Sequence, residues 1–367
     1  MKEEKEMKRV YNFNGGPAAL PLDVLKEIHE EWFDFDGTGE SILEISHRSK
    51  TFEKVLENVK DDIRHLLHLS DDYAVLFLSG GANMQFAAIP MNFLLPGKKA
   101  SYVLSSYFSE KALKEAEKIG DVQIAWQPKS GIYNHIPAPE EILVDPEAAY
   151  IHITTNGTAE GNEIFRIPNT GNVPLAADMT SDLMAREIDS HLLSFFYAGV
   201  QKNIGPAGTV LAIARKDFLK GRNPRLPNVL NYELLMEHDS MINTPPVFAI
   251  YTVGKYVKWI RQQGGVQKME RRNRKKSSMI YEIVDAHPDF YHPFADKESR
   301  SIVNVTFTLP SQSLTKRFIA EAESQNLYGL KGHRAVGGIR VSLYNGVPVE
   351  AAEHLADFME RFFKSNK

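Results

Sequence analysis

The stretch SFFYAGVQKNIGPAGT, residues Ser194–Thr209, decides how this chain folds. Its first residues continue an apolar run, Leu193–Tyr197, that is typical of a buried β-strand. Lys202 follows within a turn of small and apolar residues. A lysine in a loop is usually a solvated surface charge. Packed neighbours disfavour the ammonium form, and an amine held in this way can form a Schiff base with a carbonyl compound.

Similar apolar runs lie on both sides of this stretch and alternate with helical patterns. This alternation predicts an α/β fold whose mostly parallel sheet is buried on both faces. We expect helices at Asn83–Phe93, with a kink at Pro90, and at Ser109–Ile119. The other strands are expected at Tyr73–Leu78, Ala100–Leu104, Ala149–Thr154, Val173–Asp178 and Val210–Ala214.

The C-terminal third predicts a smaller α/β domain. A helical stretch at 248–261 is interrupted by Gly264-Gly265, a plausible boundary, and resumes to Val284. Beyond it we expect strands at 301–308 and 338–343 and helices at 313–324 and 349–364. We therefore predict a large domain of residues 16–263 and a small domain of 264–367 that also takes in 1–15. The basic run Arg271–Lys276 is interpreted as a solvated helix face, because no aromatic residues are interleaved for nucleic-acid stacking.

Two further features gather at the ends of predicted strands. Asp178 ends the strand that precedes Leu193–Tyr197, and ligands bind at this edge of parallel sheets. It could cap a helix, or it could hold the pyridine nitrogen of a cofactor protonated. The turn Ser79–Asn83 carries two glycines and leads into a helix N-terminus, which suits a phosphate. Neither a dinucleotide fingerprint nor a Walker motif is present there.

Histidine–arginine pairs occur in two distant segments, His47-Arg48 and His333-Arg334, with Arg340 close to the second. Each pair alone could be ordinary surface charge. Together they indicate an anion site assembled by folding, since the arginine fork binds carboxylates and phosphates through two parallel hydrogen bonds.

Composition excludes several classes of protein. The 367 residues include no cysteine, so disulfides, thiolate zinc sites and cysteine nucleophiles are ruled out, and we predict no metal site. The formal charge of −4 gives no basic field for nucleic acid or membranes. No apolar run approaches the ~20 residues that span a bilayer, and the charged start lacks the apolar core of a signal peptide. A cytoplasmic protein is expected.

The sequence resembles the phosphoserine aminotransferase family of class-V aminotransferases, within the pyridoxal-phosphate (PLP) fold-type I superfamily. The matching segments run in family order over nearly the whole chain. They are Phe13–Pro17 (FNGGP), Glu44–Arg48 (EISHR), Gln85–Asn92 (QFAAIPMN), Ala198–Gly208 (AGVQKNIGPAG) and Gly332–Arg340 (GHRAVGGIR). The resemblance implies a seven-stranded large-domain sheet and a homodimer with shared active sites.

The resemblance also implies a role for each matching residue. Lys202 would hold PLP as a Schiff base, and Asp178 would pair with its pyridine nitrogen. Other residues implied to contact the cofactor are Ala82, Asn83, Phe108, Thr158 and Gln201, with Asn243 and Thr244 from the neighbouring subunit. Arg340 would bind the substrate α-carboxylate. The residues implied to bind the substrate phosphate, some across the dimer interface, are His47, Arg48, His333 and Arg334.

Two positions depart from the family pattern. Phe108 stands where many members have a tryptophan over the PLP ring, and Asn83 stands where some have a phosphate-binding arginine. The implied reaction moves an amino group from L-glutamate to 3-phosphohydroxypyruvate, giving O-phospho-L-serine and 2-oxoglutarate in L-serine biosynthesis. Two alternatives stay open. One is an aminotransferase for another acid, such as alanine or serine with glyoxylate, whose uncharged side chain would not need the His-Arg pairs. The other is a non-catalytic phosphate-ligand binder, which would need neither Lys202 nor Asp178.

Overall fold

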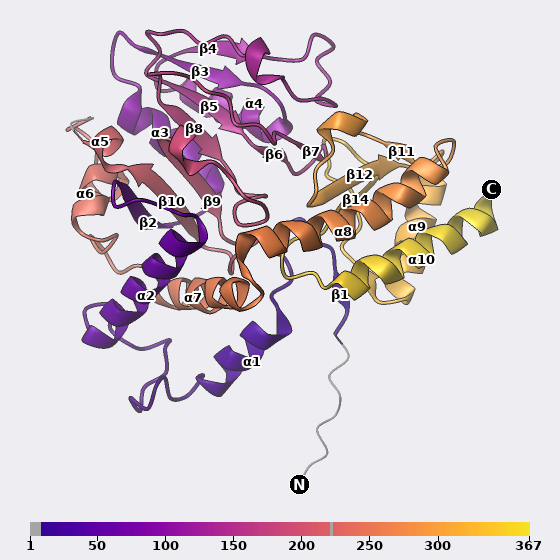
Figure 1. The fold of residues 1–367 in the computed structure, drawn as a ribbon, viewed down its shortest axis with the longest axis horizontal. Helices are drawn as coiled ribbons and strands as arrows, with labels where there is room; N and C mark the ends of the chain where they lie inside the picture. Colours follow the sequence, from indigo (N-terminus) through magenta and orange to yellow (C-terminus); the bar gives the residue numbers. More distant parts are fainter. Residues whose placement is uncertain (1–8, 221–222) are drawn as a thin grey trace.

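A seven-stranded sheet forms the centre of the protein in the computed structural model, which describes residues 9–220 and 223–367 (Figure 1). Strand β10 runs antiparallel to both its neighbours, β2 and β9, and the other pairs are parallel, so the predicted mostly parallel sheet is confirmed. In sheet order the strands are β2 (Tyr73–Ser79), β10 (Thr209–Arg215), β9 (Phe195–Gly199), β8 (Leu175–Asp178), β5 (Tyr150–Thr154), β3 (Lys99–Val103) and β4 (Asp121–Trp126).

Helices cover both faces of this sheet, because successive strand residues point to opposite sides and nearly all are apolar. Val75 and Phe77 belong to one core, and Leu76 and Leu78 to the other. The first core is closed by α1 (Leu22–Glu30), α2 (Lys50–Leu66) and α7 (Val247–Gln262). The second is closed by α3 (Ala82–Phe93), α4 (Tyr107–Ala116) and α6 (Tyr232–Glu237), and the short α5 (Lys216–Leu219) follows β10.

A smaller unit packs beside the large sheet, at the right of Figure 1. Its third hydrophobic core is built around Phe307, Phe318 and Phe358. The N-terminal strand β1 (Tyr11–Asn12) pairs in parallel with β13 (Leu327–Tyr328), far along the chain. The remaining elements are α8 (Gly265–Ala286), β11 (His292–Pro293), β12 (Asn304–Thr308), α9 (Gln312–Ser324), β14 (Ile339–Ser342) and α10 (Val349–Asn366).

Helix α8 joins the two units. Val266 and Met269 lie in the first core, whereas Ile280 and Val284 lie in the third. The division between residues 263 and 264 therefore stays a prediction. The interpretation of Arg271–Lys276 as a solvated face is wrong at two positions. Asn273 and Lys276 are buried, because their spacing of three residues puts both on the side of α8 that faces the interior.

Three local predictions also need correction. The edge strand β4 was not expected, since its residues are mostly exposed or half-buried and form no apolar run. Helix α4 begins two residues before the predicted start, because the Ser106 side chain caps it by accepting from the N–H of Ser109. Strand β12 begins at Asn304 and not at 301, because the Ser301 hydroxyl accepts the N–H groups of Val303 and Asn304 in a turn.

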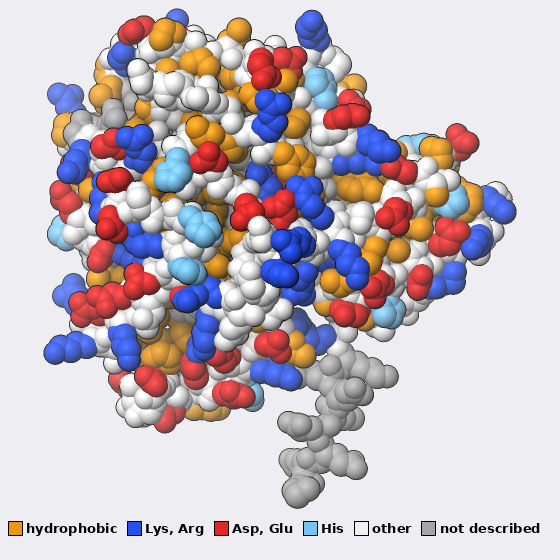
Figure 2. Space-filling view, in the orientation of Figure 1, with side chains coloured by type: hydrophobic (Ala, Val, Ile, Leu, Met, Phe, Trp, Pro, Cys, Tyr) orange, Lys and Arg blue, Asp and Glu red, His pale blue; other side chains and the backbone are white. Residues whose placement is uncertain are grey.

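The surface carries both signs of charge. Figure 2 shows lysine and arginine side chains interspersed with aspartate and glutamate over the face in view. None of the helices within residues 9–220 and 223–367 is long and apolar enough to cross a membrane.

Candidate active site

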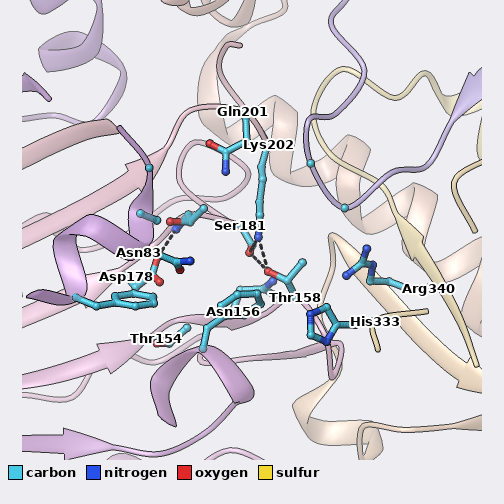
Figure 3. Close-up of a pocket in the computed structure, with 17 residues that line it drawn as sticks. Asn83, Thr154, Asn156, Thr158, Asp178, Ser181, Gln201, Lys202, His333 and Arg340 are labelled. Carbon is cyan, nitrogen blue, oxygen red and sulfur yellow. Dashed lines mark hydrogen bonds between the residues drawn. The ribbon is translucent and has the colours of Figure 1, made fainter. Parts of the chain in front are cut away.

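A cavity of about 360 Å³ opens where the parallel strands of the large sheet end. The large sheet contributes its carboxyl edge, and the smaller unit contributes the opposite wall (Figure 3). This is the edge at which α/β sheets bind ligands. The cavity is lined by Gly15, Gly16, Gly81, Ala82, Asn83, Phe86, Phe108, Thr154, Asn156, Thr158, Asp178, Thr180, Ser181, Gln201, Lys202, His333 and Arg340.

Lys202 reaches into this cavity from the turn between β9 and β10 (Figure 3). Its side chain is buried, and Nζ donates to Thr158 Oγ1 at 2.5 Å and to Ser181 Oγ at 2.9 Å. Nζ also lies 5.6 Å from the centre of the Phe108 ring. The side chain is therefore buried, as the sequence predicted, and its amine is held by two hydroxyl groups and an aromatic face.

Asp178 stands at the end of β8, and β8 pairs with β9, the strand that leads to Lys202. The carboxylate is buried, and its Oδ1 accepts the Thr180 N–H at 2.9 Å. Burial raises the pKa of Asp178, while hydrogen bonds from Thr180 and the charge of Lys202 oppose that rise. A cationic ring nitrogen beside Asp178 would favour the ionised carboxylate.

Helix α3 points its N-terminus at the same cavity. No side chain in the described part of the chain caps this end, whose N-cap is Gly81. The turn needs glycine, since Gly80 has a φ of 101°, a value that residues with a Cβ rarely adopt. Free N–H groups and the positive end of the helix dipole favour an anion beside Ala82 and Asn83. In Figure 3, Asn83 and Asp178 lie on the same side of the cavity.

The smaller unit supplies Arg340 from β14 and His333 from the preceding loop, across from Asn83 in Figure 3. Arg340 packs against the backbone of Gly15, where a Cβ would lie 2.5 Å from the guanidinium carbon. Its buried Nε has no hydrogen-bond partner within residues 9–220 and 223–367. Burial lowers the pKa of His333, and the charges of Arg340, Arg334, Lys202 and Lys111 lower it further. This wall therefore carries positive charge, and the Nε–H of Arg340 is left for a ligand to accept from, as far as the described residues go.

Glu160 is a buried acid near this wall, and the charge of Arg340 acts on it. Its Oε1 accepts the N–H of Tyr107 at 2.7 Å, at the start of the helix that carries Phe108. Oε2 is buried and is left without a partner in the described structure. Burial raises the pKa of Glu160 to about 7, although hydrogen bonds from the backbone and the charge of Arg340 work against that rise.

The cavity gathers most of the predicted site residues and leaves some outside. Those inside are Lys202, Asp178, Ala82, Asn83, Phe108, Thr158, Gln201, His333 and Arg340. Asn243 lines a neighbouring cavity of about 250 Å³, which also borders α3. Thr244, His47, Arg48 and Arg334 do not line the first cavity, and Arg48, Asn243, Thr244 and Arg334 are exposed in the single chain.

Several lining residues were not assigned from the sequence. Ser181 is the most consequential, since its hydroxyl accepts from Lys202. Its signal was its position three residues after Asp178, at the strand end that the sequence had already singled out. The pair Gly15-Gly16 lies within Phe13–Pro17, a segment quoted only for the family resemblance, and Asn156 lies two residues before Thr158. Thr154 ends β5 directly beside Asp178.

The chain is similar to known proteins over almost its full length. The family model described as aminotransferase class-V matches residues 10–355. A phosphoserine aminotransferase from Desulfatibacillum aliphaticivorans is 51% identical, over 98% of this chain and 99% of the relative. The solved phosphoserine aminotransferase from Bacillus circulans subsp. alkalophilus is 44% identical with a TM-score of 0.97, covering 98% of this chain and 100% of its own. A PLP-bound phosphoserine aminotransferase from Trichomonas vaginalis is 33% identical with a TM-score of 0.91, covering 96% and 100%.

Proposed function

This chain belongs to the class-V aminotransferases and, within them, to the phosphoserine aminotransferase family, and on that premise we propose its reaction. The protein transfers an amino group between L-glutamate and 3-phosphohydroxypyruvate, giving O-phospho-L-serine and 2-oxoglutarate. One observation carries the proposal. The buried amine of Lys202, the buried carboxylate of Asp178 and the guanidinium of Arg340 face a single cavity.

The donor set of the cavity fits PLP. The uncapped N-terminus of α3 suits the phosphate, Asp178 suits a protonated pyridine nitrogen, and Phe108 offers a ring face for stacking. A Trichomonas vaginalis relative has been solved with PLP bound. When bound, PLP supplies an electron sink for the carbanion that forms at the substrate Cα. Lys202 would hold it covalently, with Thr158, Ala82, Asn83 and Gln201 around it.

Each side chain then has a distinct task. With the cofactor in place, the free amine of Lys202 would take the proton from the substrate Cα as a general base. Thr158 and Ser181 accept hydrogen bonds from Nζ and hold it at the cavity wall. Asp178 would hold a protonated ring nitrogen of the cofactor and so favour its cationic form.

The substrates are selected by the positively charged wall of the cavity, which Arg340 and His333 form. Arg340, whose Nε–H has no partner among the residues that the structure describes, binds the α-carboxylate that both substrates share. His47, Arg48, His333 and Arg334 bind the phosphate of 3-phosphohydroxypyruvate or the side-chain carboxylate of glutamate. Both guests are anions at a similar distance from Cα, so one cluster of cations serves both. An uncharged side chain would gain nothing from it.

The enzyme acts as a homodimer with shared active sites. Arg48, Asn243, Thr244 and Arg334 are exposed in the single chain, which suits residues that serve a site completed by a second subunit. In this arrangement Asn243 and Thr244 reach the cofactor phosphate of the neighbouring subunit.

Amino-group transfer from glutamate tests the proposal when phosphorylated and unphosphorylated hydroxypyruvate are compared as acceptors. We expect the phosphorylated acceptor to be strongly preferred. Purified protein should be yellow, and glutamate alone should shift its absorbance band. Lys202→Ala should lose covalently attached cofactor and activity together. Full covalent attachment in Lys202→Ala, or equal use of both acceptors, would refute the proposal.

A further inference from the structure

Helix α8 carries a lysine in the interior of the protein. Lys276 is 1% exposed, and its Nζ donates to the carbonyl oxygens of Leu343 at 2.7 Å, Tyr344 at 2.8 Å and Val347 at 3.0 Å. Burial lowers the pKa of Lys276 well below its usual value, and the charge of Arg272 adds to this effect. The three carbonyl oxygens only accept, so they favour the ammonium form, whose three N–H groups they use completely. No carboxylate within the described residues forms an ion pair with Lys276. A buried charge of this kind is tolerated only where its hydrogen bonds are complete, so these carbonyl positions are closely fixed.

The three carbonyls belong to one turn, Leu343–Val347, which we call the hub turn. Asn345 of the hub turn donates its N–H to Asn203 Oδ1 at 3.2 Å and its Nδ2 to Met184 O at 3.0 Å. Asn203 is the residue after Lys202, and it donates to Ser181 O at 2.5 Å. Because Ser181 Oγ accepts from Lys202, the hub turn is tied to both the backbone and the hydroxyl that locate the amine.

Arg340 is tied to the hub turn from the other side. Strand β14, which carries Arg340, ends at Ser342 and leads directly into Leu343. The Leu343 N–H donates to Val303 O at 2.7 Å, and the Tyr344 hydroxyl donates to the carbonyl of Gly15, another cavity residue, at 3.4 Å. Asn273, one turn before Lys276 on α8, donates to Asn345 Oδ1 and to Ala185 O, both at 2.9 Å.

We propose that Lys276 is a positioning residue for amino transfer. Through the hub turn it fixes the distance between the amine of Lys202 and the guanidinium of Arg340. This inference rests on the proposed function, since it assigns a catalytic consequence to that spacing. Lys276 contacts neither cavity residue directly. A shift of the hub turn would move Asn203 and Arg340 relative to each other, and errors of ~1 Å in such spacing can cost ~100-fold in rate.

Lys276→Met tests this, with Lys275→Met as the matched control. Both substitutions replace a lysine at neighbouring positions of α8. Lys275, however, is exposed, and its Nζ lies 3.7 Å from Glu353 Oε1. At a temperature where circular dichroism shows Lys276→Met folded, we expect its kcat to fall by about tenfold or more. Titration of apoenzyme with PLP should give a weaker Kd, and the pH at which the bound-cofactor absorbance titrates should shift. Lys275→Met should match wild type within about twofold in each measurement.

Asn203→Ala separates positioning from stability. It removes the Oδ1 that accepts the Asn345 N–H and the Nδ2 that donates to Ser181 O, while leaving the three carbonyl partners of Lys276 in place. We therefore expect it to fold and to show the same loss of kcat and the same spectroscopic shift. Wild-type kcat, PLP affinity and absorbance titration in this variant would overturn the inference, whether or not Lys276→Met folds. If wild type itself neither binds PLP nor transfers amino groups, the proposed function fails first, and that result is distinct from a loss confined to the two variants.

Discussion

Adding one methyl group at Gly15 should damage substrate binding without damaging the fold. A Cβ at this position would lie 2.3 Å from Nη2 of Arg340, 2.5 Å from Cζ and 3.0 Å from Nη1. Ordinary contact begins near 3.4 Å, so Nη2 must retreat by about 1.1 Å. The backbone of Gly15 is not in the left-handed region, and the obstructing atoms are the far end of a flexible side chain. Gly15→Ala should therefore fold normally.

The size of the effect follows from what Arg340 does. A bidentate pair with a carboxylate depends on the placement of both nitrogens, and a displacement near 1 Å removes much of it. We expect kcat/KM for glutamate to fall by about 10- to 100-fold, which corresponds to ~1.4–2.8 kcal/mol of transition-state stabilisation. We expect kcat/KM for 3-phosphohydroxypyruvate to fall by a similar factor, because its carboxylate binds the same arginine.

Steady-state kinetics with each substrate, beside thermal unfolding, measures this. The companion variant Arg340→Lys keeps the charge but loses the fork, and should show the same pattern. If Gly15→Ala unfolds at the wild-type temperature and keeps kcat/KM within about twofold for both substrates, then Arg340 does not bind the carboxylate from the position that the structure gives it.

Three other substitutions probe the phosphate pocket, a buried acid and the smaller core. Arg48→Ala should raise KM for 3-phosphohydroxypyruvate more than for glutamate, because the phosphate carries more charge, and equal losses in steady-state kinetics would contradict this. Burial raises the pKa of Glu160 to about 7 from 4.5, so the folded state binds this proton more tightly than the unfolded chain. Stability should accordingly fall by roughly 3 kcal/mol as pH rises from about 4.5 to 7, and urea titrations of Glu160→Gln should lack that part of the slope. Phe318→Ala empties a fully buried site among Phe307, Phe358 and other rings, and it should lower the free energy of unfolding by about 3–5 kcal/mol in the same assay.

The prediction from sequence was most accurate for the buried strands of the large sheet, because these strands are continuous apolar runs. Those runs gave six of the large-sheet strands, and hence the shared edge at which Asp178 and Lys202 meet. The edge strand β4 has no such run, and only the family resemblance implied a seventh strand. Phe108 and Thr158 likewise entered through the resemblance, because neither has a local pattern that marks a site.

Contacts between segments that are distant in the chain could not be predicted from local sequence patterns. Nothing near Lys276 in the sequence distinguishes it from the exposed Lys275, since the difference arises only when α8 packs against the hub turn. The same holds for Glu160, whose raised pKa results from burial against a helix start more than fifty residues earlier in the chain.

The antiparallel strand β10 has a consequence for redesign of this scaffold. The turn that bears Lys202 is anchored at both ends, by β9 before it and by β10 after it, and β10 is paired along its whole length with β2. Inserting or deleting one residue there would shift two ladders at once, so the reach of the amine is set by the sheet. The loop at 331–338 bears no such constraint on the large sheet. Libraries that seek new acceptors should therefore vary that loop in length and leave the lysine turn at its natural length.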